Sequence, residues 1–515
     1  MTDLQQALHL HRQGQLSEAE RRYAGILQQR PDHFVALHML GVVALQTGRA
    51  NRAVELIRRA IALNGGVAAA HCNLGHALRQ LGRQGEAAAS YADAARLQDD
   101  LAEAHASLGL TLRLLQRFDE AIISCDKAIA LQPGYAETHS HRGDALLELQ
   151  RYPDAVASYD RVIALRPDVA DAHINRATAL HGLGRHDEAM AGYAAAIALA
   201  PMLPEAHVTR ALWRLKLGDF AEGWPEHEWR WRTAQFADSV RNFAQPLWLG
   251  DSDPAGKTIL LHAEQGLGDT IQFCRYARLV AARGAQVVLE VQPPLVRLMA
   301  SLGVGTVVAA GETLPPFDLH CPLMSLPLAF GTTSGDIPAA EAYLAAEPAS
   351  VAAWRRRLAP LPGLRVGLAW AGNPAATAID SRRSMALEML APLAAVPQVS
   401  LVSLQKGEAA THARGFPVQD YTDELTDFAD TAALIAALDL VISVDTAVAH
   451  LAGALGKPVW ILHRFDSCWR WLLQRSDSPW YPSARLFRQP APGDWTSVVR
   501  EVREGLHDVA IAGAR

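Results

Sequence analysis

The chain has little cysteine, no long apolar run and no excess of basic residues. No apolar run reaches the roughly 18 residues that a membrane span needs, and the polar N-terminal segment does not read as a signal peptide. The formal net charge of -6 argues against a non-specific nucleic-acid binder. The five cysteines are scattered without a CxxC pair, so neither a disulfide framework nor a thiolate zinc site is expected: Cys72, Cys125, Cys274, Cys321 and Cys468. These absences together predict a protein of the reducing cytoplasm.

The first half instead carries a 34-residue repeat. Small residues recur at three fixed phases: Gly41, Gly75, Gly109, Gly143, Ala177 and Ala211; Gly14, Gly48, Gly82, Gly184 and Gly218; Ala19, Ala53, Ala87, Ala121, Ala155 and Ala189. Proline recurs at a fourth phase: Pro31, Pro133, Pro167 and Pro201. This period predicts stacked helix–turn–helix units, with small residues where the two helices cross and proline ending the second helix.

Histidines also share a phase of the repeat: His71, His105, His139, His173 and His207. Successive units stack about 10 Å apart, whereas metal–nitrogen distances are near 2 Å. We therefore expect these side chains to pack or to line a groove, and not to bind a metal.

The repeat phases resemble the tetratricopeptide repeat, with L-G early, Ala midway and Pro at the end. The resemblance covers residues 1–232 and implies an α-solenoid with a concave peptide-binding groove. Asn73 and Asn175 share the phase at which some protein-glycosylating relatives hold peptide backbone, so the resemblance makes them candidates for an acceptor groove.

Residues 233–256 form a junction that lacks the repeat pattern. The tryptophans around it are expected to cover the open end of the solenoid: Trp224, Trp229, Trp231 and Trp248. Asp251-Ser252-Asp253 has the form of a metal-binding DxD motif. It precedes a strand and is flanked by Pro254 and Gly256, so a polar turn is the better interpretation.

The second half alternates short apolar runs with helical segments, which predicts parallel sheets. Expected strands are 257–262, 286–290, 306–308, 365–370, 400–404, 440–443 and 459–462. They divide into two Rossmann-like halves, residues 257–360 and 361–490, with a cleft between them and a C-terminal helix and tail over 491–515. Gly266 and Gly268 could begin a dinucleotide fingerprint with Glu290 as its acid, but Ile271 replaces the third glycine.

The segment DTAVAH, residues 445–450, lies between an expected strand and helix. Asp445 and Thr446 stand at the strand's carboxyl end, where open α/β sheets bind ligands. Thr446 is a natural N-cap, and the amides that follow, from Ala447 onward, can hold a phosphate. His450 lies one turn along, on the face that could meet the cleft.

This segment resembles the donor-site motif of heptosyltransferase-like GT-B glycosyltransferases, D-[ST]-x-x-x-H. GLGD, residues 266–269, resembles the matching element of their first half, whose aspartate is the base. GLAWAGN (367–373), Arg382-Arg383-Ser384 and SLQKG (403–407) follow in the family's order. The fold is thus expected to be an N-terminal tetratricopeptide solenoid followed by a GT-B double Rossmann-like domain. The layout resembles bacterial protein glycosyltransferases, including those that modify flagellin.

The resemblance implies an inverting transfer of sugar from a nucleotide sugar to Ser or Thr of a protein held by the array. Asp269 would be the base or a helix cap, with Glu264 as the alternative base and His262 orienting either. The amides at Thr446–Ala447 and the side chain of Arg383 would stabilise the departing phosphate without a metal or other cofactor. Further sugar-donor contacts are expected from Gly266, Gly268, Trp370, Asn373, Ser384, Gln405, Lys406, Asp445 and His450. Neither nucleic acid nor membrane insertion is expected.

Two other functions stay open at this point. A repeat scaffold with a degenerate transferase domain would bind partners without catalysis, and an NAD enzyme would use the incomplete glycine motif. The four tryptophan and tyrosine residues near the end of the second half are expected in the core: Trp469, Trp471, Trp480 and Tyr481.

Overall fold

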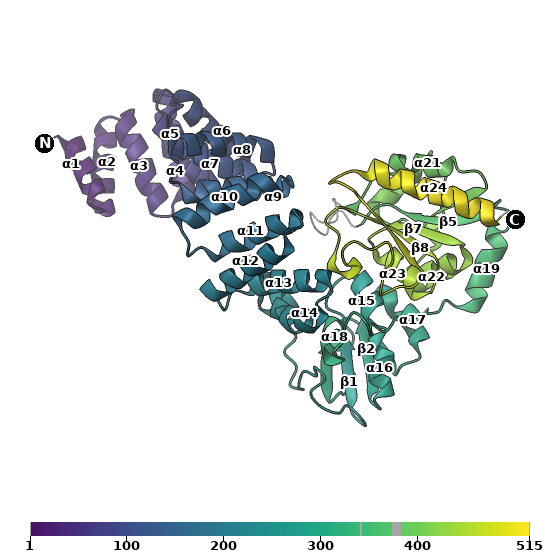
Figure 1. The fold of residues 1–515 in the computed structure, drawn as a ribbon. Helices are drawn as coiled ribbons and strands as arrows, with labels where there is room; N and C mark the ends of the chain where they lie inside the picture. The colour runs from purple at the N-terminus through teal and green to yellow at the C-terminus, as the bar shows by residue number, and fades with distance from the viewer. Residues whose placement is uncertain (1, 340–341, 373–382, 514–515) are drawn as a thin grey trace. The chain divides into compact units, whose positions relative to one another are not determined.

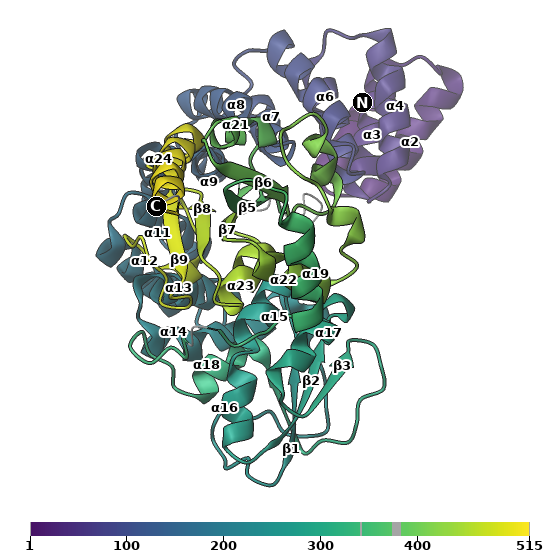
Figure 2. The ribbon, with the colours of Figure 1, turned by 90° about the vertical axis from the view of Figure 1, so that its right-hand side faces the viewer.

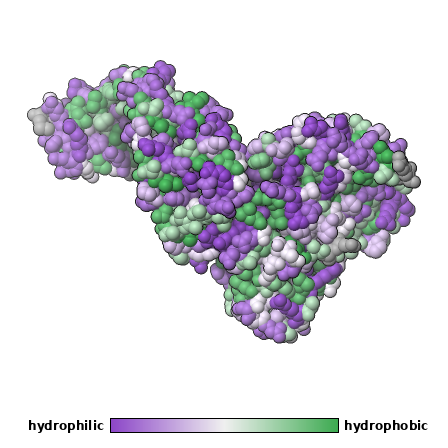
Figure 3. Space-filling model, viewed as in Figure 1, coloured by the Kyte–Doolittle hydropathy of each residue, from purple (hydrophilic) through white to green (hydrophobic). Residues whose placement is uncertain are grey.

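The computed structural model describes residues 2–339, 342–372 and 383–513 and divides into two compact units, Met1–Ala206 and His207–Arg515. The first unit is a run of antiparallel helix pairs (Figure 1). Its helices are α1 (Asp3–Arg12), α2 (Leu16–Gln29), α3 (Phe34–Gln46), α4 (Ala50–Leu63), α5 (Ala68–Gln80), α6 (Gln84–Leu97), α7 (Ala102–Leu114), α8 (Phe118–Leu131), α9 (Ala136–Glu148), α10 (Tyr152–Leu165), α11 (Ala170–Gly182) and α12 (His186–Leu199). Hydrophilic and hydrophobic residues are interspersed over the face of these helices in Figure 3.

Small residues let the two helices of each unit cross closely, as the repeat predicts. A Cβ added at Gly75 would lie 2.6 Å from Cε1 of Tyr91, and one added at Gly143 would lie 2.8 Å from Cε1 of Tyr159. The alanines of the third phase are fully buried: Ala19, Ala53, Ala87, Ala121, Ala155 and Ala189. At these two crossings the first helix has a glycine, and the tyrosine ring of the second helix fills the space that a side chain would occupy.

The turn between the two helices needs a left-handed residue. The glycines of the second phase adopt it, with φ between 72° and 87°: Gly14, Gly48, Gly82, Gly184 and Gly218. The same phase is occupied in two units by Gln116 (φ 60°) and Gln150 (φ 57°). These two turns therefore keep the left-handed geometry without a glycine. The left-handed backbone costs free energy for glutamine but not for glycine.

The second unit begins with the last two repeat helices, α13 (Pro204–Leu217) and α14 (Phe220–His227). Leu215 and Phe220 belong to the same apolar core as the first sheet, and so does Trp224, whose indole N–H donates to the Thr332 carbonyl at 3.1 Å. Trp248 is fully buried in that core as well. The repeat period runs on to about residue 232, whereas the compact units divide between Ala206 and His207.

The first sheet has four parallel strands in the order β3-β2-β1-β4. They are β1 (Thr258–His262), β2 (Gln286–Val291), β3 (Thr306–Ala309) and β4 (Leu319–Pro322). The helices of this half are α15 (Leu267–Phe273), α16 (Tyr276–Ala282), α17 (Val296–Met299), α18 (Leu326–Ala329) and α19 (Pro348–Leu358).

The second sheet has five parallel strands in the order β6-β5-β7-β8-β9. They are β5 (Leu364–Ala369), β6 (Val399–Ser403), β7 (Leu440–Val444), β8 (Val459–His463) and β9 (Ala484–Arg488). Residues of α24 (Trp495–Gly513) pack on one face of this sheet, together with the short α21 (Ala391–Ala394), and α22 (Phe428–Ala437) and α23 (Ala447–Ala454) pack on the other (Figure 2).

One apolar core joins the two sheets, because it includes both the strand residues of the first half and α23 of the second. Arg275 links the halves by polar contacts: its guanidinium donates to the Trp480 carbonyl at 2.7 Å and to the Tyr343 hydroxyl at 2.9 Å. The Tyr343 amide donates in turn to the Ala454 carbonyl of α23 at 3.0 Å. Two Rossmann-like halves are therefore present, and they are packed directly against each other.

Within the described ranges, no helix has both the length and the apolar character required to cross a membrane.

Candidate active site

The N-terminus of α23 follows directly on β7 and has open amides. Thr446 occupies the N-cap position with an extended backbone, but its hydroxyl contacts the Ser443 hydroxyl at 3.1 Å and makes no cap. Among the described residues, the amides of Ala447 and Val448 have no hydrogen-bond acceptor. This helix tip therefore offers two N–H groups and the positive end of a helix dipole at the carboxyl edge of the sheet.

Three arginines surround the acid beside this tip. Burial raises the pKa of Asp445, and the Trp471 indole and the guanidinium groups of Arg383, Arg470 and Arg464 oppose that rise. Asp445 also lies 3.7 Å from Nε2 of His450. One carboxylate among three guanidinium groups leaves a net positive region, which suits a diphosphate.

His450 is held rigidly in the wall of this region. Its Nδ1 lies 2.9 Å from the Tyr481 hydroxyl, and its ring stacks on Trp471 with centroids 5.3 Å apart. Burial holds the pKa of His450 well below its ordinary value, so the ring is neutral at pH 7. Trp469, Trp471, Trp480 and Tyr481 are themselves buried, which confirms their expected place in the core.

Asp269, in the first half, both caps its own helix and reaches the second half. Its Oδ2 accepts the Gly266 amide at 3.0 Å at the start of α15, and its Oδ1 pairs with Nη2 of Arg470. The side chain keeps 20% of its surface exposed. The Asp269 carboxylate can accept a proton only when its ion pair with Arg470 is broken.

The two halves also approach each other closely at Gly268. A Cβ built on it would lie 2.9 Å from Cδ2 of His450 and 3.6 Å from Cα of Ala447. The N-terminal turns of α15 and α23 therefore face each other. Figures 1 and 2 both show the two helices side by side. The structure thus brings Gly268 and Asp269 together with Ala447 and His450.

Glu264 lies deeper than Asp269 and has both carboxyl oxygens engaged. Its Oε2 is 3.0 Å from Nη2 of Arg230, and its Oε1 accepts the Met324 amide at 3.1 Å. The side chain is only 2% exposed, and burial raises its pKa to about 7. The surroundings of Glu264 are those of a buried structural acid that fixes the loop after β1.

His262 stands apart from both acids. Its Nε2 lies 3.3 Å from Nδ1 of His320, and burial lowers its pKa to about 3. In the part of the chain that the structure describes, no hydrogen bond joins His262 to Asp269 or Glu264.

The remaining motif residues of the second half hold its loops in place. Gln405 accepts the amides of Trp370 at 3.0 Å and of Ala371 at 2.9 Å, and Lys406 donates to the carbonyls of Thr422 and Leu425, both at 2.8 Å. Ser384 Oγ accepts the Gly372 amide at 3.0 Å, and Trp370 is 1% exposed. Asn373 and Arg382 lie outside the described residues.

Sequence reasoning missed Arg470 and Arg464, which lie between β8 and β9. Both stand in a tryptophan-rich stretch whose aromatic residues predict core packing, although an arginine between two tryptophans, as in WRW, also indicates a cation–π contact. Lys216 of α13 was missed as well. Its side chain is buried near the loop that follows β8. Burial lowers the pKa of Lys216 to about 8, although the negative charge of Asp466 acts in the other direction.

Asn73 and Asn175 are half-buried in the first unit, and each contacts the preceding repeat. Asn73 Nδ2 lies 3.0 Å from Nε2 of His38, and Asn175 donates to Asp144 at 3.2 Å. Four of the repeated histidines contact the carbonyl six residues earlier, at 3.0–3.2 Å: His71, His105, His139 and His173. These histidines therefore fasten the turns between units.

A hollow of ≈ 200 Å³ lies on α7 and α9 of the same unit. Polar side chains and apolar surface both line it: Glu103, Ala106, Ser107, Leu110, Tyr135, Glu137, Thr138 and His141. A hollow on repeat helices is suited to an extended polypeptide.

Two parallel sheets that meet where their strands end, beside a positive helix tip, define a double Rossmann-like α/β architecture. Family models agree with this class. Residues 424–489 match glycosyltransferase family 9 (heptosyltransferase), and residues 10–71, 72–136 and 142–204 match the tetratricopeptide repeat. The chain therefore combines tetratricopeptide repeats with a glycosyltransferase domain of the heptosyltransferase type. The matched segment contains Asp445, Thr446 and His450, and also Arg464 and Arg470.

Among curated proteins, Protein FlbA of Caulobacter vibrioides is 31% identical over 326 residues, which are 58% of this chain and 54% of that protein. The chain thus spans about half the length of this relative. Among solved structures, the C-terminal part of a tetratricopeptide-repeat protein from Cytophaga hutchinsonii is 17% identical, covering 46% of this chain and 100% of that chain with a TM-score of 0.38. YrrB, described as a TPR protein with an unusual peptide-binding site, is 18% identical, covering 35% and 92% with a TM-score of 0.33.

Proposed function

We propose that this protein transfers a glycosyl group from a nucleotide sugar to Ser or Thr of a protein acceptor, with inversion and without a metal in the transfer step. The observation that carries the proposal is the tip of α23, where the open amides of Ala447 and Val448 stand among the charges of Arg383, Arg464 and Arg470. This arrangement fits the diphosphate of a sugar nucleotide. Amides and guanidinium groups can stabilise the departing phosphate, which is the role that a metal ion plays elsewhere.

Asp269 is the base in this proposal. It is more exposed than Glu264, whose two oxygens are already engaged. In the transfer step Asp269 takes the proton of the acceptor hydroxyl as that oxygen bonds to the anomeric carbon, and the bond from this carbon to the diphosphate breaks. The diphosphate competes for Arg470, so binding of the sugar donor frees Asp269 from its pair.

The acceptor is a polypeptide held by the repeat unit. The hollow on α7 and α9 and the half-buried Asn73 and Asn175 support this assignment. Flagellin, which the resemblance of the layout suggests, is the first acceptor to assay. The cytoplasm is the compartment we assign, since sugar nucleotides are substrates there.

The test begins with a screen of sugar nucleotides by thermal shift. A ligand at 100 times its Kd stabilises the native state by about 2.7 kcal/mol. Asp445→Ala, which removes the acid beside the tip of α23, should weaken binding of the sugar donor. If no sugar nucleotide raises the melting temperature of the wild type, the transferase proposal fails and a repeat scaffold takes its place.

Asp269→Asn tests the base. The change should lower transfer by about 10²–10⁴-fold, the usual contribution of a general base, while binding of the sugar donor persists. Asp253→Asn is the matched control, because Asp253 only accepts the Ala255 amide in an exposed turn. Transfer at the wild-type rate by Asp269→Asn would remove Asp269 as the base.

An NAD enzyme is a weaker candidate. Glu290, the acid that the cofactor's ribose would need, is buried and paired with Arg241, and the third glycine position is filled by the fully buried Ile271. The thermal-shift screen includes NAD as a ligand, and a shift with NAD alone would reverse this ranking.

A further inference from the structure

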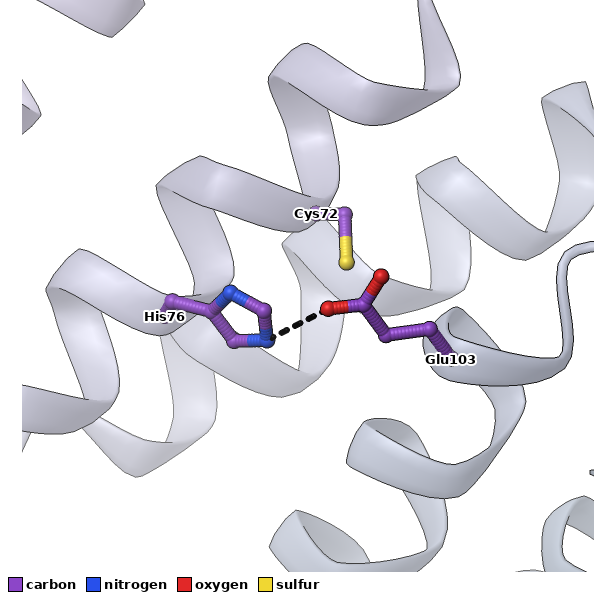
Figure 4. Close-up of side chains that lie close together, drawn as sticks. All are labelled: Cys72, His76 and Glu103. Carbon is purple, nitrogen blue, oxygen red and sulfur yellow. Dashed lines mark ion pairs between the residues drawn. The ribbon is translucent and has the colours of Figure 1, made fainter. Parts of the chain in front are cut away.

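Three side chains of different metal-binding chemistry meet in the first unit (Figure 4). Cys72 and His76 lie four residues apart on α5 and so share one face of that helix. Glu103 stands in the first turn of α7. One ligand atom from each of the three lies within 4.8 Å of the other two.

The repeat itself does not account for this combination. One period before or after Cys72 the chain has His38 and Ala106, and one period from His76 it has Val42 and Leu110. A thiol and an imidazole at these two phases therefore occur together in this unit and not in its neighbours.

The contacts around His76 leave its ring pointing at the cluster. Nε2 of His76 is 3.8 Å from Oε1 of Glu103 and 3.4 Å from the Ser107 hydroxyl. The Cys72 side chain is buried, whereas the Glu103 side chain is 59% exposed and can reorient. Glu103 and Ser107 also line the hollow on α7 and α9, so the cluster opens into it.

We propose that Cys72, His76 and Glu103 bind a zinc ion. Thiolate, imidazole and carboxylate are the ligands that zinc takes in proteins, at about 2.0–2.3 Å. Tetrahedral ligand atoms at such distances stand about 3.3–3.8 Å apart, so the present spacing closes by about 1 Å, mainly through movement of Glu103. The Cys72 thiol gives its proton to solvent as the Zn–S bond forms. Water takes the fourth position, on the side of the hollow.

This site is independent of the sugar-transfer step. It belongs to the repeat unit, and its ligands come from two neighbouring repeats. Zinc would therefore tie one repeat to the next beside the hollow where we place the acceptor. Because a ligand that binds only the native state stabilises it, zinc should raise the melting temperature of the full chain.

The experiment uses the full chain, stripped of metal with a chelator, and Co²⁺ as a spectroscopic substitute for Zn²⁺. One Co²⁺ per chain should give a thiolate-to-metal absorption band in the near ultraviolet, and one equivalent of Zn²⁺ should displace it. Cys72→Ser should abolish the band. His76→Gln and Glu103→Gln should each weaken Zn²⁺ binding at least tenfold.

Cys125→Ser and His173→Gln are the matched controls, because Cys125 is a buried cysteine of the same unit and His173, which contacts the Pro167 carbonyl at 3.2 Å, is a repeat histidine outside the cluster. Both controls should bind zinc like the wild type. Less than one zinc per wild-type chain, or unchanged affinity in His76→Gln, would overturn the proposal. His76 is half-buried, so this variant keeps the test decisive even if Cys72→Ser does not fold. Since the readout is metal binding, the result stands whether or not sugar transfer is found.

Discussion

Replacement of Gly268 by alanine tests how closely the two halves of the glycosyltransferase domain are packed. Gly268 lies inside α15, where alanine would ordinarily stabilise the helix by about 1 kcal/mol. Here the new methyl group would stand 2.9 Å from Cδ2 of His450, well inside the 3.5–4.0 Å at which carbon atoms pack best.

The His450 ring has little room to yield. It is hydrogen-bonded to the Tyr481 hydroxyl and stacked on Trp471, and the ring of Tyr481 is itself pressed against Gly453, where a Cβ would lie 2.4 Å from Cδ1. Overpacking of such a core costs about 1–3 kcal/mol. The gain of about 1 kcal/mol in helix propensity is smaller than the upper part of this overpacking cost. Gly268→Ala should therefore destabilise the domain by up to about 2 kcal/mol.

Urea unfolding of the full chain, followed by tryptophan fluorescence, measures this change, because Trp471 and Trp480 lie in the affected core. Gly335→Ala is the control, since the nearest atom to its new Cβ would be 3.9 Å away. If Gly268→Ala unfolds at the same urea concentration as the control, or at a higher one, the contact between α15 and α23 does not exist in solution. The glycine would then have to be explained by a ligand and not by packing.

Two further predictions concern stability. Gln116→Gly and Gln150→Gly should each stabilise the repeat unit by up to about 1 kcal/mol, because both residues have a left-handed backbone. Thermal unfolding checks this, and Gln132→Gly, at an ordinary φ of -142°, should destabilise instead. Burial also lowers the pKa of His227, His262, His450 and His463. The unfolded chain therefore binds more protons below pH 6.5, and the free energy of unfolding should fall as the pH drops from about 7 to 5, by up to about 1.4 kcal/mol per histidine and pH unit. A flat profile from urea titrations over this range would mean that these rings are already solvated.

Much of the fold could be predicted because its elements depend on local patterns. The expected strands over 286–290, 440–443 and 459–462 match β2, β7 and β8 to within one residue. The strands β4 and β9 were missed. The first is four residues long beside a proline-rich passage, and the second has charged residues at both ends of its apolar core, so neither gives a clear period.

The site was predicted less completely, because a sequence does not tell where a polar atom points. Gln405 and Lys406 stand in a segment that resembles a family motif, yet their described hydrogen bonds go to nearby backbone. The sequence gives no sign of the proposed zinc site for a related reason. Its ligands come from two repeats and fit no short spacing, so only the folded structure brings Cys72, His76 and Glu103 together.

The assignment of α13 and α14 to the second unit bears on how this protein can be cut and recombined. A fragment that starts after residue 232 would strip Leu215, Phe220 and Trp224 from the core and leave a hole beneath the first sheet. A break between α12 and α13 spares them. The last repeat is thus an integral part of the second unit, and exchange of the preceding repeats, by evolution or by design, should take place on its N-terminal side.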